Sequence, residues 1–436
     1  MEAVKAAHTN GGVSYFALGT NRSGHRLPER LKRPLGQLGS FRQVDRARSR
    51  PTVLHLLRLD EWAGTQVQVA TQVIRTDPAA CEQRVAILDP PGDLYERLRA
   101  AGVEVMSLNG RFGAWGATCR LALMLRRAPV DVIEAYGFRA GLIARAAAAS
   151  RRPAIIIGVR GLHFSESEDA DSRRTRLVIA AERCLSPTVQ SYDANSRGAR
   201  DFLVAHGLPR QKFTVIPNGV ESEAMAVSAL RTGSSTRVVC VARFISRKRQ
   251  DTLVRALGIV RDSGVDVEVE FIGDGPTLPR VHALVNDLGL DDRVEFAGAL
   301  VHAEVQRRLL AADIFALTSL WEGMPGSVLE AMATGLPVIG SDVNGTNEAI
   351  VDGVTGLLVP PNDPGAFAHA LAALASDVRL RRRMGVAGRR RIEEEFSFDR
   401  VVADKVALYR RVCGYPAVQP SGASMSPGIS EGVARP

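Results

Sequence analysis

The chain has 436 residues, 45% of them hydrophobic and 24% charged, which is the balance of a globular protein with more residues than one compact core holds. Its five cysteines include no C-x-x-C pair, which argues against a disulfide framework or a zinc site and fits a reducing compartment. No apolar run reaches the ~18 residues that span a bilayer, and the first residues lack a signal-peptide core, so we expect a cytoplasmic protein of two domains.

The net charge of +9 is placed unevenly along the chain. Residues 1–50 carry ten Lys and Arg against three Asp and Glu, and residues 51–220 carry 22 against 17, whereas residues 221–436 carry 24 against 27. A basic first half attracts an acidic substrate or the anionic face of a membrane, or it only keeps the protein soluble. Nucleic acid is disfavoured as a partner because aromatic residues, at 5%, offer few platforms for stacking bases.

Residues 1–50 mix Gly, Arg and Pro without a period of 2 or 3.6, so we predict a disordered basic leader there. From Pro51 onward, short apolar runs alternate with helical segments, which predicts βαβ units and a parallel sheet in a first domain at 51–220. The predicted strands are 52–58, 84–89, 103–108, 130–135, 153–159 and 213–220, and the predicted helices are 65–75, 93–101, 117–127, 138–149 and 171–182.

A short polar stretch after Val220 is predicted to be an interdomain linker, and the alternation then starts again. We therefore expect a second doubly wound α/β domain at 221–398, a helix at 399–414 that returns to the first domain, and a disordered tail at 415–436. The predicted strands of the second domain are 237–244, 267–273, 293–298, 313–319, 336–342 and 355–360, with helices around Leu253 and at 277–289 and 302–311.

Ligands of such sheets bind beyond the carboxyl ends of the strands, so the loops at these ends are the candidate sites. Arg243 directly follows one predicted strand, and Lys248 lies five residues later near the start of a helix. Two cations beside a helix N-terminus predict a site for a diphosphate. The alternative is that both side chains are only solvated, although cations at this end of a helix oppose its dipole.

Two carboxylates follow another strand of the second domain. Glu322 precedes the turn-forming run GMPG at 323–326, and Glu330 follows eight residues after Glu322 in an apolar helical segment. Both could accept hydrogen bonds from the vicinal hydroxyls of a sugar or a ribose, and a Gly/Pro loop lets backbone amides approach a ligand. Alternatively, Ser327 and Glu330 form the capping box S-x-x-E at the start of the helix.

Two glycine-containing segments carry weaker signals. The run IGDGP contains Gly273 and Gly275 but lacks the third glycine of a phosphate-binding loop, so a plain turn is the alternative. The run IPNGV contains Asn218 followed by Gly219, and we interpret this turn dipeptide as a turn before the hinge.

Taken in order, the motifs of residues 212–365 resemble those of the family 4 glycosyltransferases, the retaining nucleotide-sugar enzymes with the GT-B fold. The E-x7-E spacing of Glu322 and Glu330 is the most specific of these motifs. The resemblance implies two Rossmann-like, doubly wound parallel-sheet domains that face each other across a cleft, with the acceptor bound by the first and the donor by the second. The matching segments are FTVIPNGVES, VARFISRKRQDTLVRAL, FIGDGP, RVEFAGAL and ADIFALTSLWEGMPGSVLEAMATGLPVIGSDVNGTNEAIVDGVTGLLVPPNDP.

The resemblance also implies catalytic roles for three of the residues above. Arg243 and Lys248 would hold the donor diphosphate and stabilise the charge on the departing nucleotide, in place of a metal ion. Glu322 would contact hydroxyls of the donor sugar. Glu330 would bind the ribose hydroxyls, a role that is compatible with its place in a capping box.

Further donor-binding residues follow from the same resemblance. The backbone of Gly323, Met324 and the neighbours of Pro325 would line the sugar and phosphate site. Leu300 would lie against the nucleobase, and Gly64 matches the glycine of the first domain that approaches the diphosphate and the acceptor.

One position departs from the family pattern. Family members often have a histidine, facing the donor sugar, in the loop where this chain has Tyr136. His163, in the next loop, is a possible partner on the acceptor side, although a lone histidine is more often structural. This departure leaves the acceptor-side chemistry open.

The resemblance therefore implies a retaining, metal-independent hexosyltransferase without a cofactor, which takes a nucleotide sugar as co-substrate. A UDP-sugar is favoured as donor and a GDP-sugar is possible; the acceptor is a hydroxyl of a saccharide or a lipid-linked sugar, in polysaccharide or glycolipid synthesis. From the basic first half we also expect peripheral contact with the anionic inner face of the membrane. The alternatives are another GT-B chemistry, such as an epimerase or a phosphorylase, and a catalytically degenerate sugar-nucleotide-binding module.

Overall fold

A computed structural model describes residues 49–58, 64–149, 152–161, 173–221 and 235–416. All of them belong to one unit of the chain, Gln43–Pro436. The predicted leader and tail lie almost wholly outside the described residues, as do His163 and most of the predicted linker. Among the described residues no helix is both long and apolar enough to cross a bilayer.

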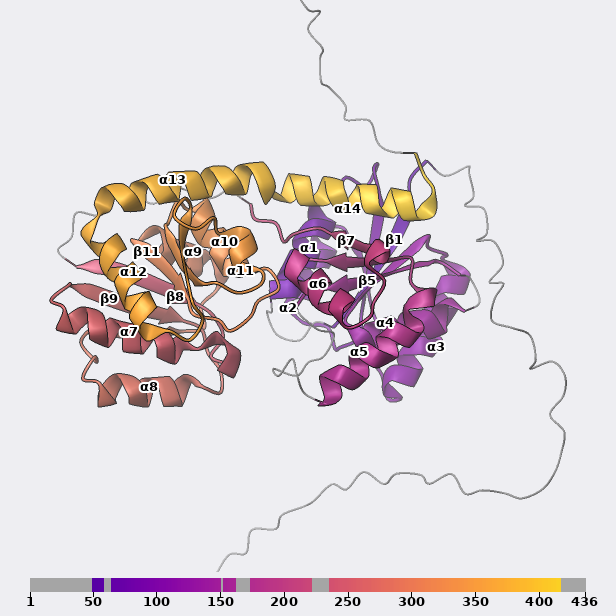
Figure 1. The fold of residues 1–436 in the computed structure, drawn as a ribbon. Helices are drawn as coiled ribbons and strands as arrows, with labels where there is room; N and C mark the ends of the chain where they lie inside the picture. The colour runs from indigo at the N-terminus through magenta and orange to yellow at the C-terminus, as the bar shows by residue number, and fades with distance from the viewer. Residues whose placement is uncertain (1–48, 59–63, 150–151, 162–172, 222–234, 417–436) are drawn as a thin grey trace, which may run out of the picture. The chain divides into compact units, whose positions relative to one another are not determined.

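The first sheet has seven parallel strands (Figure 1). They are β1 (Thr52–Leu57), β2 (Glu82–Ile87), β3 (Glu104–Ser107), β4 (Val132–Tyr136), β5 (Ala154–Val159), β6 (Ser191–Ala194) and β7 (Phe213–Val215). Their order in the sheet is β3-β2-β1-β4-β5-β6-β7. The runs TVLHLL of β1 and AIIIGV of β5 are buried along their whole length, as expected of strands that are covered on both faces.

Helices cover both faces of this sheet. They are α1 (Gly64–Arg75), α2 (Asp93–Ala100), α3 (Gly113–Arg127), α4 (Phe138–Ala148), α5 (Arg173–Leu185) and α6 (Arg197–Ala205), with short 3-10 helices η2 (Ser186–Thr188) and η3 (Arg210–Lys212). Leu121 of α3, Ile143 of α4 and Ile179 of α5 share one core cluster with the central strands. Val73 of α1 and Leu98 of α2 belong to another cluster, on the opposite side of the sheet (Figure 1).

Strand β6 and helix α6 were not predicted from the sequence. The four residues of β6, Ser-Tyr-Asp-Ala, are all buried, but two of them are polar and give no apolar run. The short helix α6 is capped by Ser196, whose side chain accepts a hydrogen bond from the amide of Ala199. Polar contacts inside the domain thus form elements that hydrophobic periodicity misses.

The second sheet has six parallel strands in the order β10-β9-β8-β11-β12-β13. They are β8 (Thr236–Val241), β9 (Val267–Ile272), β10 (Val294–Gly298), β11 (Ile314–Leu317), β12 (Val338–Ser341) and β13 (Gly356–Val359). The helices of this part are α7 (Gln250–Asp262), α8 (Leu278–Asp287), α9 (His302–Leu310), α10 (Gly326–Ala333), α11 (Thr346–Ala349), α12 (Pro364–Ser376) and α13 (Val378–Glu395). The prediction of two doubly wound parallel-sheet domains is confirmed.

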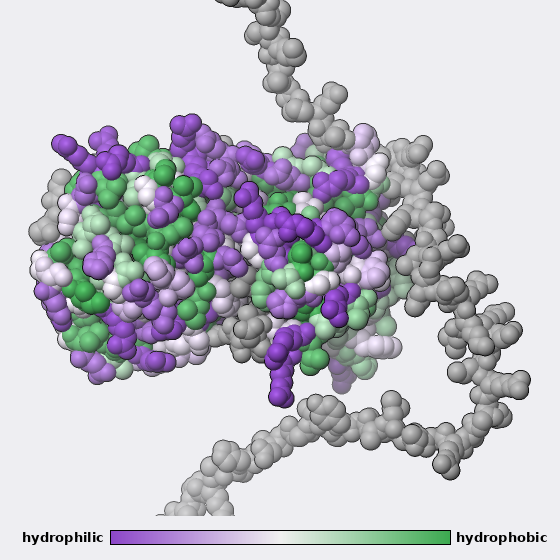
Figure 2. Space-filling model, in the orientation of Figure 1, coloured by the Kyte–Doolittle hydropathy of each residue, from purple (hydrophilic) through white to green (hydrophobic). Residues whose placement is uncertain are grey.

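Helix α13 has a strongly charged outer surface, and Figure 2 shows hydrophilic residues along it. Three Arg–Glu pairs four residues apart stabilise its last turns, and they are Arg389–Glu393, Arg390–Glu394 and Arg391–Glu395. The last helix, α14 (Phe398–Cys413), lies where the sequence predicts a helix at 399–414. Its residues Val401, Leu408 and Tyr409 share a core cluster with Val53 of β1 and Val132 of β4, so α14 packs on the first sheet.

A buried polar network fastens α14 to the first sheet. Lys405 is 1% exposed, and its Nζ donates to Glu134 Oε1 at 2.7 Å and to the carboxylate of Asp193. Arg160 pairs with the same Asp193, and Tyr409 Oη donates to Glu134 Oε2 at 2.5 Å. Two carboxylates and two cations therefore balance each other inside the domain, which is the arrangement that makes buried charge tolerable.

The network controls the protonation of its members. Burial alone would raise the pKa of Glu134, but Lys405 and Arg160 lower it to about 2. Burial lowers the pKa of His55 in β1 to about 3, and the charge of Lys405 adds to this effect. His55 is therefore neutral, with Nδ1 bonded to Tyr136 Oη at 3.1 Å and Nε2 to Gln83 Oε1 at 2.7 Å.

We expect His55 to make the protein less stable in acid. The unfolded chain takes up a proton at this residue below its ordinary pKa of 6.5, whereas the folded protein does so only near 3, so stability falls as the pH drops through 6.5. At pH 5 the loss relative to pH 8 amounts to about 2 kcal/mol. We expect the unfolding free energy of His55→Asn, measured with urea at both pH values, to fall by about 2 kcal/mol less between pH 8 and pH 5 than that of the unsubstituted protein.

The matched control is His206→Asn, because His206 is an exposed histidine of the same domain. Its unfolding free energy should depend on pH as that of the unsubstituted protein does. If His55→Asn also kept the full decrease, the buried neutral histidine would not be the source of the acid sensitivity.

Candidate active site

Four loops of the second domain meet at one edge of its sheet. Strands β10, β9, β8 and β11 are neighbours in this order, and because they are parallel their carboxyl ends share one edge. Leu300 follows β10, Gly273 follows β9, Arg243 follows β8 and Glu322 follows β11. The topology therefore brings these predicted site residues to the same edge of the sheet.

Glu322 is the centre of the best-defined contacts at this edge. It is 5% exposed, and its Oε1 accepts hydrogen bonds from Lys248 Nζ and, at 2.5 Å, from Ser319 Oγ. The guanidinium of Arg247 lies 3.6 Å from Glu322 Oε2. The structure thus joins Lys248 and Glu322, which the sequence placed in one site, and adds Arg247 and Ser319.

The charge of Glu322 depends on these neighbours. Burial by itself would raise the pKa of this carboxyl group. Lys248 and Arg247, together with the hydrogen bonds from Lys248 and Ser319, lower it below its ordinary value instead. Glu322 is therefore an anion at neutral pH and can accept further hydrogen bonds from hydroxyl groups.

The loops after β8 and β11 are also tied together through their backbones. The amide of Leu320 donates to the carbonyl of Arg247 at 2.7 Å, and Thr318 Oγ1 donates to the carbonyl of Lys248 at 2.8 Å. The guanidinium of Arg247 lies 4.3 Å from the ring centre of Trp321. These contacts fix the cations of one loop against the carboxylate of the other.

Arg243 has a different environment from Lys248. Its side chain is exposed, and no hydrogen bond or ion pair of it is found within the described part of the chain. Its carbonyl, in contrast, accepts from Gln250 Nε2 at 2.9 Å, so the backbone is held in place while the guanidinium extends into solvent. Arg243 therefore remains a cation that a ligand at this edge can use.

The glycines of IGDGP are required by close backbone contact with the loop after β8. Gly273 and Gly275 have φ angles of 141° and 150°, and a Cβ at Gly275 would lie 2.4 Å from the carbonyl oxygen of Phe244. The amide of Phe244 donates to the carbonyl of Asp274 at 2.9 Å. This segment is thus more than the isolated turn that was one interpretation of it.

Glu330 is not part of a capping box, and that interpretation was wrong. Helix α10 begins at Gly326 with Pro325 in the N-cap position, so Ser327 lies inside the helix and does not occupy the capping position that the box requires. Glu330 is half-buried, one turn into α10. Burial raises the pKa of its carboxyl group to about 7. Its carboxyl group is therefore not explained by helix capping.

The remaining donor-side positions lie around these groups. Gly323, Met324 and Pro325 are buried and connect Glu322 to α10. The carbonyl of Met324 accepts from Asn218 Nδ2 at 2.8 Å, which gives the predicted IPNGV turn a contact with this loop. Leu300 is partly buried, packs against the core and follows β10.

The two predicted site residues of the first domain that the structure describes, Gly64 and Tyr136, lie in different environments. Gly64 is the first residue of α1, and a Cβ there would have nothing within 4 Å. Tyr136 ends β4, but its hydroxyl is bonded to His55 and its ring lies 5.4 Å from the Arg160 guanidinium. The phenol thus belongs to the buried network, and its predicted role toward the acceptor stays a prediction.

Arg247 and Ser319 were missed because their residue types are not distinctive. Arg247 lies within the basic run RFISRKR, of which only Arg243 and Lys248 were selected, by their places after a predicted strand and near the start of a helix. Ser319 precedes Glu322 by three residues in a loop, where a hydroxyl has many common roles. The basic character of the run was a signal for Arg247, but no sequence signal distinguished Ser319.

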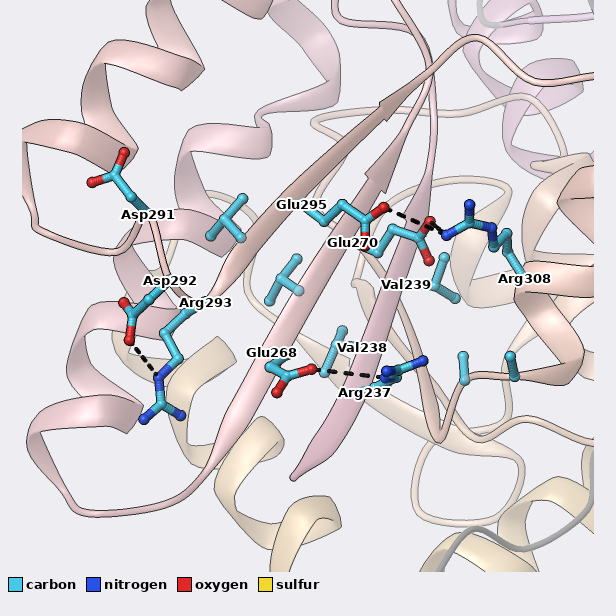
Figure 3. Close-up of a pocket in the computed structure, with 14 residues that line it drawn as sticks. Arg237, Val238, Val239, Glu268, Glu270, Asp291, Asp292, Arg293, Glu295 and Arg308 are labelled. Carbon is cyan, nitrogen blue, oxygen red and sulfur yellow. Dashed lines mark hydrogen bonds and ion pairs between the residues drawn. The ribbon is translucent and has the colours of Figure 1, made fainter. Parts of the chain in front are cut away.

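A hollow of about 300 Å³ lies at the other end of the same strands (Figure 3). It is lined by charged residues that pair with one another, such as Arg308 with Glu270 at 2.6 Å and Arg237 with Glu268 at 3.7 Å. Because Arg237 lies at the amino end of β8, this hollow is separate from the carboxyl-end loops. No group of three His, Cys, Asp or Glu suited to a metal ion occurs in the described ranges.

Two family models match the chain, one over each sheet. The Glycosyl transferase 4-like domain matches residues 52–219, and Glycosyl transferases group 1 matches residues 223–391. The resemblance drawn from the sequence motifs is therefore confirmed, and it extends to the first half, where few motifs were recognised.

Curated relatives match over part of their length. The amylovoran biosynthesis glycosyltransferase AmsK of Erwinia amylovora is 33% identical over 203 residues, 45% of this chain and 50% of the relative. The GDP-mannose-dependent alpha-(1-6)-phosphatidylinositol monomannoside mannosyltransferase of Mycolicibacterium smegmatis is 34% identical over 204 residues, 43% of this chain and 53% of the relative. The chain thus spans about half the length of these two relatives.

Among solved structures, Anabaena Alr3699/HepE in complex with UDP and glucose resembles the whole fold. The two superpose with a TM-score of 0.72 and 19% sequence identity, over 83% of this chain and 100% of the other. At this level of identity the likeness shows the fold alone, which is GT-B.

Proposed function

The chain belongs to the glycosyl transferases group 1 family, and we propose that it transfers a sugar from a nucleotide-diphosphate sugar to a hydroxyl group of an acceptor. The observation that carries this proposal is the group formed by Lys248, Arg247 and Glu322 at the carboxyl edge of the second sheet. It offers cations for a diphosphate and a buried anion for sugar hydroxyls within one set of contacts.

The cations act on the leaving group. When the bond between the anomeric carbon and the phosphate oxygen breaks, negative charge grows on the diphosphate. Lys248, which is held by Glu322, and Arg243, which extends into solvent, stabilise that charge without a metal ion. The acceptor oxygen forms the new bond to the anomeric carbon, and its proton leaves with the departing diphosphate.

The carboxylates orient the donor. Glu322 is an anion whose position is fixed by Lys248 and Ser319, so it can accept hydrogen bonds from hydroxyls of the donor sugar. Glu330 binds the ribose hydroxyls, and the backbone around Gly323 lines the sugar. We propose that the anomeric configuration is retained, as the family resemblance implies, without the paired general acid and base of a glycosidase.

The donor and acceptor are proposed by class. The names of similar proteins include a GDP-mannose-dependent enzyme and a structure with UDP, and we propose a UDP-sugar or a GDP-sugar as donor. One of these names specifies a phosphatidylinositol monomannoside and another amylovoran biosynthesis, so we propose a saccharide or lipid-linked acceptor at the inner face of the membrane.

We expect one nucleotide sugar to stabilise the protein in a thermal-shift panel of UDP- and GDP-sugars. The increase in Tm should grow with concentration as the binding free energy RT ln(1 + [L]/Kd) predicts. Release of the nucleoside diphosphate should then require an acceptor and yield a product of unchanged anomeric configuration. Binding without transfer or donor hydrolysis across a broad acceptor set would instead indicate a binding module, and interconversion of free nucleotide sugars would indicate an epimerase.

Replacing Lys248 should selectively weaken the binding of nucleoside diphosphates. A charged hydrogen bond is worth about 1.5–3 kcal/mol, so Lys248→Ala should reduce the affinity for UDP or GDP by roughly 10- to 100-fold. The affinity for the free nucleoside should change little in calorimetric titration. The control Arg390→Ala, which removes an exposed cation of α13, should leave both affinities unchanged, and an equal loss for nucleoside and diphosphate in Lys248→Ala would refute the phosphate role.

Donor affinity should depend on pH through Glu330. Burial raises the pKa of Glu330 to about 7, and a ribose hydroxyl donates to the ionised carboxylate, so a carboxyl group that is protonated below pH 7 must lose its proton before the donor binds. Affinity for the nucleotide sugar, measured by titration, should fall by up to about tenfold per pH unit below 7. Glu330→Gln cannot titrate and should give a flat profile; an unchanged profile would place the titration elsewhere.

A further inference from the structure

Helix α3 carries large apolar side chains on its outer face as well as on its inner face. One face packs Ala117, Leu121 and Leu125 into the core beside the first sheet, which is the ordinary role of a helix in this fold. The opposite face exposes Trp115 at 73% and Leu123 at 47%, two helical turns apart, with Phe112, just before the helix, exposed at 72%. The outward face of α3 therefore carries large apolar side chains, together with the exposed Arg126, where a surface helix is normally polar.

This concentration of exposed apolar area is local. Phe112 and Trp115 are the only Phe or Trp side chains that count as exposed in the described part of the chain. Other exposed residues, such as Val386 on α13, are single aliphatic side chains of the kind found on most protein surfaces. Two large aromatic side chains on one helix end need another explanation.

Arginines accompany these apolar residues on α3 and α4. Arg111 is exposed just before α3, Arg127 is exposed at its end, and the neighbouring α4 exposes Arg139 and Leu142. Arg120, in the middle of α3, is also exposed, and its guanidinium donates to the carbonyl of Leu108 at 3.4 Å and to that of Asn109. We call these five residues, together with Phe112, Trp115 and Leu123, the α3–α4 face.

The arginines are not explained by the stability of the helices alone. A cation at the end of a helix, such as Arg127, favours the helix dipole, but Arg111 lies before the first turn of α3, where a cation opposes it. Within residues 110–149 the only acidic residues are Asp131 and Glu134. Asp131 accepts from the amide of Thr52 at 2.8 Å and Glu134 is fully buried, so neither carboxylate of this segment neutralises the face.

We propose that the α3–α4 face binds the surface of an anionic lipid bilayer. Phe and Trp rings at the start of α3 would enter the interface between headgroups and acyl chains, where aromatic side chains are preferred. The arginines around them would contact lipid phosphates, and their charge matches an anionic leaflet. The inference rests on the proposed function for its setting at the membrane, but the binding itself depends only on this face.

The test is sedimentation of the full chain with vesicles. The protein should partition to phosphatidylcholine vesicles that contain phosphatidylglycerol and much less to phosphatidylcholine alone, and added salt should weaken the binding. Phe112→Ser with Trp115→Ser should reduce the partition coefficient at least tenfold. Arg111→Gln with Arg127→Gln should reduce it about 25-fold, at about fivefold for each arginine.

Matched controls separate this face from the general charge of the chain. Arg382→Gln with Arg383→Gln removes the same charge from exposed positions of α13, and Val386→Ser removes an exposed apolar side chain there; both should leave partition nearly unchanged. Trp115→Phe should keep the binding but lose the blue shift of tryptophan fluorescence that insertion produces. Donor-induced thermal stabilisation, measured on every variant, should be unaffected.

Equal binding to neutral and anionic vesicles, or full binding by the variant with Phe112→Ser and Trp115→Ser, would overturn the proposal. The proposal would also be overturned if the protein did not bind vesicles but associated with itself as its concentration rose, and this variant abolished the association. The face would then be a contact between copies of the chain. If the variant with Phe112→Ser and Trp115→Ser loses vesicle binding but is still stabilised by the donor, the membrane face is supported. If the unsubstituted protein binds vesicles but no donor stabilises it, only the proposed function is contradicted.

Discussion

A buried carboxylate organises the candidate site. Glu322 is 5% exposed, and an isolated anion at that depth is so unfavourable that it would be protonated or would open the loop to water. Lys248 and Arg247 offset this cost, and both come from the loop after the neighbouring strand. The requirement to compensate one carboxylate therefore fixes two loops relative to each other before any ligand binds, which is the preorganisation that electrostatic catalysis needs.

The parallel sheet places those loops together, and close backbone packing keeps them there. Neighbouring parallel strands end at one edge, but side chains of ordinary size would separate the loops that follow them. At Gly275 a Cβ would lie 2.4 Å from the carbonyl of Phe244, so only glycine allows the loops after β8 and β9 to pack directly on each other. Arg243 projects from this rigid backbone into solvent, held by contacts of its main chain.

The sequence predicted well those features that depend on apolar periodicity and on local motifs. Strands such as AIIIGV, both doubly wound domains and the placement of Lys248 and Glu322 in one site all belong to this class; the ion pair between these two side chains was not predicted. Strand β6 was missed because its buried residues include Ser191 and Asp193, whose burial depends on partners distant in the chain. The capping-box interpretation failed because α10 begins before Ser327: Pro325 takes the N-cap position, so the helix already includes the serine that was expected to cap it.

The charges of the first domain fall into two groups with opposite consequences. Inside, Glu134 and Asp193 are balanced by Arg160 and by Lys405, which the chain supplies from a helix more than two hundred residues away in sequence. This balance allows the interior to hold α14 in place without a net charge. On the surface, the arginines of the α3–α4 face receive no such compensation from the acidic residues of their own segment. Part of the basic excess of residues 51–220 is therefore displayed where a partner can meet it, beside aromatic side chains that water alone would not favour.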